Sequence, residues 1–273
     1  MINNSNLLST GGRWQSALVA TAAVFAVGSA SGAAQAATVA GLVDGKTLVM
    51  IDTDAKKVTR SVAVEGGPLV GIDVRPADKM LYGVTADGKI LTIDPATGKT
   101  TMKSQISEKL PTGVDFVVDF NPVADRLRLM ASDGTSLRIN VDDGKAIVDG
   151  RLKYAETDAS KGKTPKISVG AYTNSYAGTK ETALFDIDLS SATLVKQAPP
   201  NDGILNTVGA LGVKLDGGAA FDISSDGKGG NAAWLMVGSM LHAVDLATGK
   251  ATPAATIGGL GGRVTDIAVM PAN

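Results

Sequence analysis

The segment IDPATGK at residues 93–99 returns almost unchanged as VDLATGK at residues 244–250. Each copy ends an apolar strand with an aspartate that can accept hydrogen bonds from its own turn, and then offers a glycine that tolerates positive φ. Three weaker copies lie at residues 51–56, 139–145 and 187–191. The repeat therefore predicts hairpin turns of one kind at five places along the chain.

A second repeated feature is a short apolar strand that carries an aspartate. It occurs around Asp73, Asp119, Asp222 and Asp266. Asp73 precedes the turn residue Asp94 by 21 positions, and Asp222 precedes Asp245 by 23. Each of the five units takes about 47 residues, which is the size of a four-stranded propeller blade.

The hydrophobic pattern from residue 37 onward predicts an all-β chain, because short runs rich in Val, Ile, Leu and Thr alternate with turn residues. The first unit has three expected strands, at residues 39–42, 47–51 and 58–64, and one strand at residues 264–270 is left over. We expect these strands to form one sheet, which closes a five-bladed β-propeller of four antiparallel strands per blade. An open β-sandwich is the alternative fold.

The fourth unit is the least regular. Residues 171–174 stand where the other units have their aspartate strand, and the turn after Asp188 could close an earlier hairpin than the other turns do. Between Tyr172 and Tyr176 the sequence offers two aromatic rings together with amide and hydroxyl groups. This mixture suits sugars or peptides, although an ordinary solvated loop is the simpler interpretation.

The first 36 residues have the pattern of a secretory signal peptide. Residues 17–27 form an apolar run that is too short to span a bilayer, and residues 34–36 give the small-x-small pattern that signal peptidase cleaves. We expect residues 1–36 to be a signal peptide and residues 37–273 to be a single β-propeller domain, exported to the periplasm or the medium. A buried N-terminal helix is the alternative, and no membrane span is expected.

Composition excludes several classes of function. The 26 basic and 27 acidic residues, with only 4% aromatic residues, give no cationic surface for nucleic acid. A single histidine, His242, and no cysteine argue against zinc, copper and haem sites, which gather several nitrogen or sulfur ligands. We therefore expect no resident cofactor, with Ca²⁺ or Mg²⁺ bound by oxygen ligands as the alternative.

The four repeated aspartates are the main candidates for a site. If their strands are the innermost of each blade, the carboxylates surround the axis and could attract a hard cation. The simpler hypothesis is that each one accepts hydrogen bonds from nearby amides and locks one blade to the next. Carboxylates so close together would raise one another's pKa unless a cation, or Arg75 and Arg126, neutralised them.

The predicted site combines these acids with polar residues close to them in the repeat. The candidate ligand-binding residues are Asp73, Arg75, Asp119, Asn121, Tyr172, Asn174, Asp222 and Asp266. No catalytic residue is predicted, and the metal question stays open.

Several motifs resemble those of a secreted bacterial family known only as domain of unknown function 4394. They are GIDVRP at residues 71–76, DFNP at 119–122, DRLR at 125–128, LRINVD at 137–142, AYTNS at 171–175 and NTVGALG at 206–212. These motifs run in order along nearly all of residues 37–273. The resemblance implies an exported, propeller-like domain without an assigned activity, and it supplies no catalytic residue.

We therefore expect a monomeric, exported propeller that binds an unknown small molecule, glycan or protein through the loops and channel of one face, without catalysis. One alternative is a divalent-metal-dependent hydrolase of the lactonase type, in which an axial cation polarises a carbonyl or a water molecule. The other alternative is a surface or matrix protein that works by self-association.

Overall fold

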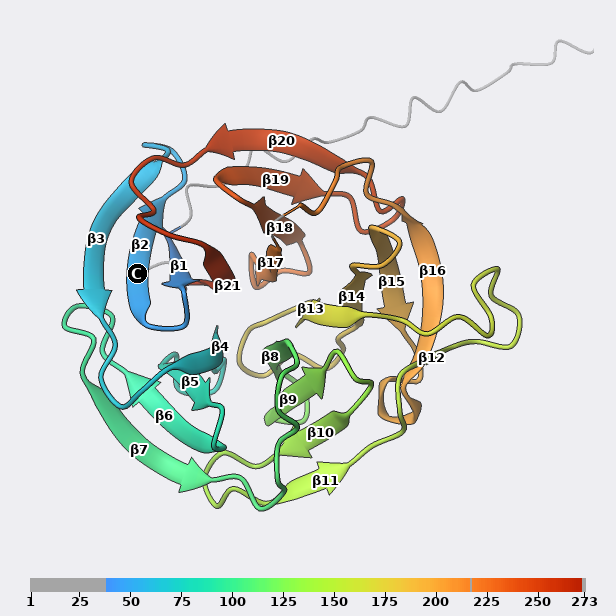
Figure 1. Cartoon of the computed structure of the whole chain (residues 1–273), viewed down its shortest axis with the longest axis horizontal. Coiled ribbons are helices and arrows are strands. Elements are labelled where there is room, and N and C mark those ends of the chain that lie inside the picture. The colour runs from blue at the N-terminus through green and yellow to red at the C-terminus, as the bar shows by residue number, and fades with distance from the viewer. Residues whose placement is uncertain (1–37, 217, 272–273) are drawn as a thin grey trace, which may run out of the picture. The chain divides into compact units, whose positions relative to one another are not determined.

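A computed structural model describes residues 38–216 and 218–271, so the predicted signal peptide lies outside the described residues. In this part of the chain 21 strands, β1 to β21, form five sheets arranged as blades around one axis (Figure 1). The described residues contain no helix that is long and apolar enough to cross a bilayer. The predicted five-bladed, all-β propeller is confirmed.

Each blade starts with a strand at the axis and ends with a strand at the rim (Figure 1). Blade 1 consists of β21 (Val264–Val269), β1 (Thr38–Val43), β2 (Thr47–Asp52) and β3 (Lys57–Ala63). Blade 2 consists of β4 (Leu69–Val74), β5 (Leu81–Thr85), β6 (Lys89–Ile93) and β7 (Thr100–Gln105). Blade 3 consists of β8 (Phe116–Asn121), β9 (Arg126–Ala131), β10 (Ser136–Ile139) and β11 (Ala146–Val148).

Blade 4 has an additional strand. It consists of β13 (Ile167–Tyr172), β14 (Leu184–Asp188), β15 (Thr193–Gln197) and β16 (Ile204–Ala210), with the short β12 (Lys153–Tyr154) parallel to β16 at the rim. A single 3-10 helix in the described residues, η1 (Pro200–Asp202), lies between β15 and β16. Blade 5 consists of β17 (Ala219–Ser225), β18 (Asn231–Val237), β19 (Met240–Val244) and β20 (Ala251–Thr256).

The ring closes through a sheet that combines the two ends of the described chain. Strand β21 pairs antiparallel with β1, so that Val39 lies opposite Val269 and Leu42 lies opposite Asp266. The predicted pairing of the leftover strand with the first unit is therefore confirmed. Closure satisfies the inner edge of β1, which would otherwise be open to pairing with another chain.

The repeated turns occupy the same hairpin in four blades, because they follow the third strand counted from the axis. The turn after Asp188 instead joins β14 to β15, which are the second and third strands of blade 4. The alternative of an earlier hairpin at this turn is thus the correct one. The expectation of equivalent turns in all five units is wrong for blade 4.

The hydrophobic core lies between neighbouring blades and consists mainly of aliphatic side chains. Blades 2 and 3, for example, bury Val84, Ile90, Leu127 and Leu129 together. Burial of such surface stabilises the fold by about 25 cal/mol per Å². Because each blade needs a neighbour on both sides to cover its faces, the closed ring is what fixes the innermost strands around the axis.

Candidate functional site

Four of the five innermost strands place a buried aspartate near the axis. These residues are Asp73 on β4, Asp119 on β8, Asp222 on β17 and Asp266 on β21. Carboxylate oxygens of Asp73, Asp119 and Asp222 lie within 4.8 Å of one another. The repeat thus brings together acids that are far apart in the sequence, as the sequence predicts.

Each axial aspartate accepts a hydrogen bond from a backbone amide of the following blade. The four bonds are Ile72 N to Asp266 Oδ2 at 2.8 Å, Phe120 N to Asp73 Oδ2 at 2.7 Å, Tyr172 N to Asp119 Oδ1 at 3.0 Å and Val269 N to Asp222 Oδ2 at 2.6 Å. Three of the aspartates also accept the amide of the next residue, which is Val74, Ile223 or Ile267. The predicted locking of blade to blade is therefore present at four of the interfaces between neighbouring blades, which we call aspartate seams. A carboxylate oxygen has two lone pairs, so these bonds leave room for a ligand.

In the part of the chain that the structure describes, no arginine forms an ion pair with an axial acid. Arg75 points away from them, with Nη2 at 2.6 Å from Asp125 Oδ2 and 3.2 Å from Asp142 Oδ2, and the bond to Asp125 raises the pKa of Arg75. Arg126 donates to the carbonyl oxygens of Ala124 and Asp125. The two arginines that the sequence offered as partners of the axial acids therefore have other roles, because Arg75 joins blade 2 to blade 3 and Arg126 binds carbonyl oxygens of its own turn in blade 3.

Burial dominates the electrostatics of the axial acids. It raises the pKa of Asp222 to about 6, against the lowering effect of two amide donors. Burial, followed by the charge of Asp222, raises the pKa of Asp73 well above its ordinary value, and burial followed by Asp73 does the same for Asp119. Burial also raises the pKa of Asp266. Burial and mutual repulsion therefore disfavour the ionised form of these acids, and a positive charge nearby would stabilise it.

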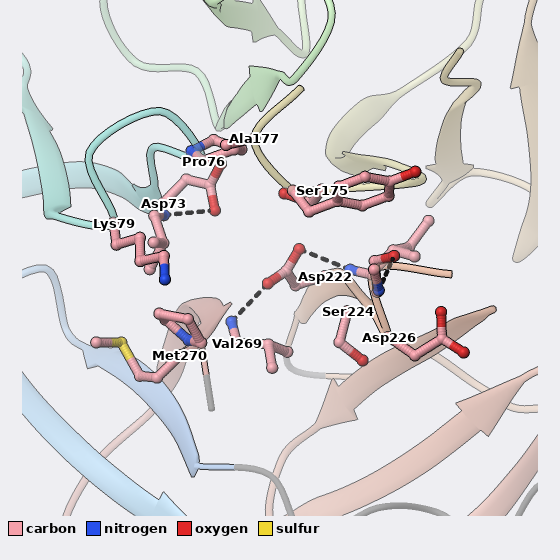
Figure 2. A pocket seen from close by; sticks show the side chains of 16 residues that line it. Asp73, Pro76, Lys79, Ser175, Ala177, Asp222, Ser224, Asp226, Val269 and Met270 are labelled. Carbon is pink, nitrogen blue, oxygen red and sulfur yellow. Dashed lines mark hydrogen bonds between the residues drawn. The ribbon is translucent and has the colours of Figure 1, made fainter. Parts of the chain in front are cut away.

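A pocket of about 350 Å³ opens at one end of the axis, with Asp73 and Asp222 among its lining residues. Apolar walls come from Val74, Pro76, Val269, Met270 and Pro271, and polar groups come from Lys79, Ser175, Tyr176, Ser224, Ser225 and Asp226. Figure 2 shows Asp222 in the middle of this pocket, bonded to Val269, with Lys79 and Asp226 on opposite sides. We refer to it as the axial pocket.

Tyr172 and Asn174 do not line the axial pocket, although the sequence places them among the candidates. Tyr172 is 1% exposed, and its hydroxyl accepts a hydrogen bond from Arg128 Nε at 3.1 Å. The expectation that this ring offers a face to a ligand is wrong, because Tyr172 is part of the core between blades 3 and 4. Asn174 exchanges hydrogen bonds with Asn231, and only Tyr176 of the two predicted rings reaches the pocket.

Asn121 closes a local turn rather than contacting the axial pocket. Its Oδ1 accepts the amides of Val123 and Ala124 at 3.0 and 2.9 Å. Ser175 and Tyr176, from the loop that the sequence offered for recognition, do line the pocket, whereas sequence reasoning missed Lys79. Its position in the chain is a usable signal, because the loops that follow the carboxyl-terminal ends of β4 and β13 reach the same end of the axis.

Comparison with known protein families gives a match to "Domain of unknown function (DUF4394)" over residues 47–268. The chain belongs to this family. The match confirms the resemblance seen in the sequence motifs, and DUF4394 carries no assigned activity that could be transferred to the axial pocket. Comparison with curated proteins finds no significant match.

Comparison with solved structures finds a protein of unknown function from Bacteroides caccae, with 13% identity and a TM-score of 0.43. The match covers 81% of this chain and 73% of that one. Another is a protein of unknown function from Bacteroides thetaiotaomicron, with 15% identity and a TM-score of 0.48, covering 80% of this chain and 57% of that one. Dihydro-heme d1 dehydrogenase NirN has 12% identity and a TM-score of 0.38, covering 82% of this chain and 44% of that protein. Similarities at this level carry no argument about what the DUF4394 domain does.

Proposed function

We propose that this domain is an exported binding protein that takes a small, positively charged organic ligand in the axial pocket. The observation that carries the proposal is the pair of buried carboxylates, Asp73 and Asp222, in the lining of a pocket that opens at the axis. Buried acids without a basic partner are unfavourable, and a bound cation would compensate their charge. Export is inferred from the signal-peptide pattern in residues 1–36.

The pocket favours an ammonium group attached to a carbon skeleton. Val74, Val269 and Met270 provide apolar surface beside the acids, and about 350 Å³ accommodates a small organic molecule rather than a single ion. Lys79 at one side repels a second positive group, whereas Asp226 at the other side attracts one (Figure 2). A diamine with one end at Asp222 and the other toward Asp226 fits this charge distribution best.

Calorimetric titration of residues 37–273 tests the proposal. We expect 1,4-diaminobutane to bind at pH 7.5 and 1-butanol, which lacks the charge, not to bind. Asp222→Asn should weaken diamine binding by about tenfold, which is the effect of losing one charged hydrogen bond. The matched variant Asp52→Asn, in a surface turn of blade 1, should leave it unchanged.

A pH series supplies a test that needs no variant. Because the pKa of Asp222 is about 6, protonation below that pH removes the charge that holds the ligand, and diamine affinity should fall from pH 7.5 to pH 5. Equal binding of butanol and the diamine, or a diamine affinity that does not change with pH, would disprove the proposal.

A divalent-metal-dependent hydrolase is the second candidate, favoured by the three carboxylates whose oxygens lie within 4.8 Å of one another. Ca²⁺ or Mg²⁺ would be the matching ion, because both prefer oxygen ligands. Metal analysis of the purified protein, together with a thermal shift on adding a chelator, distinguishes the candidates. One tightly bound ion per chain, with hydrolysis of a lactone, would support the hydrolase and displace the amine proposal.

We further propose that the protein works as a monomer. Light scattering at high protein concentration tests the alternative of a self-associating surface or matrix protein, which predicts a mass that increases with concentration.

A further inference from the structure

The longest connection between successive blades is the one that enters blade 4. Residues 149–166 join β11 to β13 and include β12, whereas only residues 64–68 join blades 1 and 2 and residues 211–218 join blades 4 and 5. Figure 1 shows this segment projecting outward from the ring beside β12. Connections of this length in a compact domain often have a function of their own.

The segment is attached to the ring at its start and near its middle. At the start, the buried Arg128 donates a hydrogen bond to Asp149. Near the middle, Asp158 accepts the amide of Thr207 on β16 at 2.6 Å and its hydroxyl at 2.9 Å. Strand β12 adds a parallel pairing to β16 between these points. The segment is therefore preorganised, which reduces the entropy lost when a ligand binds.

A groove of about 370 Å³ lies along this segment and has an excess of positive charge. Its charged lining residues are Arg151, Lys153, Lys161 and Lys163 on the basic side, and Asp133 and Glu156 on the acidic side. Lys161 is paired with Glu156, Nζ to Oε2 at 2.7 Å. Within residues 38–216 and 218–271, no ion pair is formed by Lys153 or Lys163.

We propose that this basic groove is a second binding site, which takes a sugar-sized ligand carrying a phosphate or sulfate monoester. A tetrahedral oxyanion is bound well by several cationic donors that converge, and Lys153 and Lys163 remain available for it. The volume of the groove exceeds that of one anion and leaves space for the body of the ligand. The basic groove and the axial pocket have opposite charge, so this site does not depend on the proposed function.

Titration of residues 37–273 at low ionic strength with glucose 6-phosphate, glucose 6-sulfate and glucose tests the inference. We expect the charged sugars to bind and glucose not to bind, and the tighter of the two esters identifies the natural anion. Lys153→Gln combined with Lys163→Gln should weaken ester binding by about tenfold, because each exposed ion pair contributes a few-fold at most. The lysines are exposed, so this variant should fold normally.

The matched control is Lys57→Gln combined with Lys99→Gln, which removes two exposed lysines from blades 1 and 2. It should leave ester binding unchanged. An equal loss in both double variants would show that binding reflects overall charge only, and the inference would be wrong. It would also be wrong if neither ester bound at millimolar concentration, whatever the outcome at the axial pocket.

Discussion

Blade 4 carries its buried carboxylate on a different strand from the other blades. The other blades have their aspartate on the innermost strand, whereas blade 4 has Asp186 on β14, the second strand. Gly170 of the innermost strand lies opposite Asp186, and a Cβ atom there would meet the carboxylate. The missing side chain at Gly170 therefore makes room for an acid that reaches in from the neighbouring strand.

The two arrangements differ in what surrounds an equally buried acid. Asp222 accepts amide hydrogen bonds from Ile223 and Val269, and its pKa is raised only to about 6. Neither oxygen of Asp186 has a hydrogen-bond partner among the described residues, and burial raises its pKa to about 8. At Asp222 the two amide donors thus oppose the effect of burial and keep the carboxylate ionisable near neutral pH, which a cation-binding site requires, whereas Asp186 has no such donor and remains a neutral acid.

The same difference affects how the blades are joined. Four seams have an aspartate on one blade that accepts an amide of the next, as at Asp119 and Tyr172. Between blades 4 and 5 the corresponding link is made by Asn174 and Asn231, through Asn174 N to Asn231 Oδ1 at 2.7 Å and Asn231 Nδ2 to Asn174 Oδ1 at 2.9 Å. This seam uses neutral groups that are only partly buried. We expect it to contribute less to stability than an aspartate seam does.

The largest effect should follow from breaking an aspartate seam. Asp266→Ala removes the acceptor of the Ile72 and Ile267 amides and leaves both donors buried without partners. We expect the free energy of unfolding to fall by about 3 kcal/mol, because an unsatisfied buried donor costs about 1–3 kcal/mol. Urea unfolding should be measured at pH 5. Because the pKa of Asp266 is raised, its side chain is neutral in the folded protein at this pH, so the substitution by alanine changes the hydrogen bonds and not the charge.

The control for Asp266→Ala is another aspartate that also accepts two amides but lies in a surface turn. Asp52 accepts the amides of Asp54 and Ala55, and Asp52→Ala should lower the free energy of unfolding by about 1 kcal/mol or less, because water can replace the bonds. If the two variants lost the same stability, the aspartate seams would have no special importance for the ring.

A pH-dependent effect should follow from Asp186. The ordinary aspartate pKa is 3.8 and the pKa in the folded protein is about 8, so the folded protein retains a proton that the unfolded chain releases as pH rises. Stability is therefore lost between about pH 4 and pH 8, at about 1.4 kcal/mol per pH unit. Asp186→Asn cannot titrate and should remove this part of the pH dependence.

Urea unfolding at pH 5 and pH 7 measures the contribution of Asp186. The wild-type protein should lose about 2–3 kcal/mol more than Asp186→Asn between these pH values. The axial acids titrate in both proteins, so their contribution cancels in the difference. Parallel curves for the two proteins would show that Asp186 is ionised in the folded state.

The sequence predicts the parts of this arrangement that repeat and misses the parts that do not. Asp73 and Asp266 lie in matching strand patterns, so their common position at the axis follows from periodicity. Asp186 has no such signal, because its burial results from the space beside Gly170, which is created only when two strands pair. At Tyr172 the sequence predicts an exposed ring where the structure has a buried one. The residue lies in a segment that the sequence indicates as a loop, but it is 1% exposed because blades 3 and 4 pack around it.

The smallest effect should follow from breaking the seam between blades 4 and 5. Asn231→Ala removes both hydrogen bonds to Asn174, and these groups are partly buried, so water can take over much of their hydrogen bonding. We expect a loss of about 1 kcal/mol in the free energy of unfolding, at the low end of what two neutral hydrogen bonds contribute. Urea unfolding of Asn231→Ala beside Asp266→Ala gives the comparison directly. If Asn231→Ala lost as much stability as Asp266→Ala, the asparagine pair would stabilise its seam as strongly as a buried carboxylate does. Hydrogen-bond geometry, rather than burial of the acceptor, would then determine the strength of a seam.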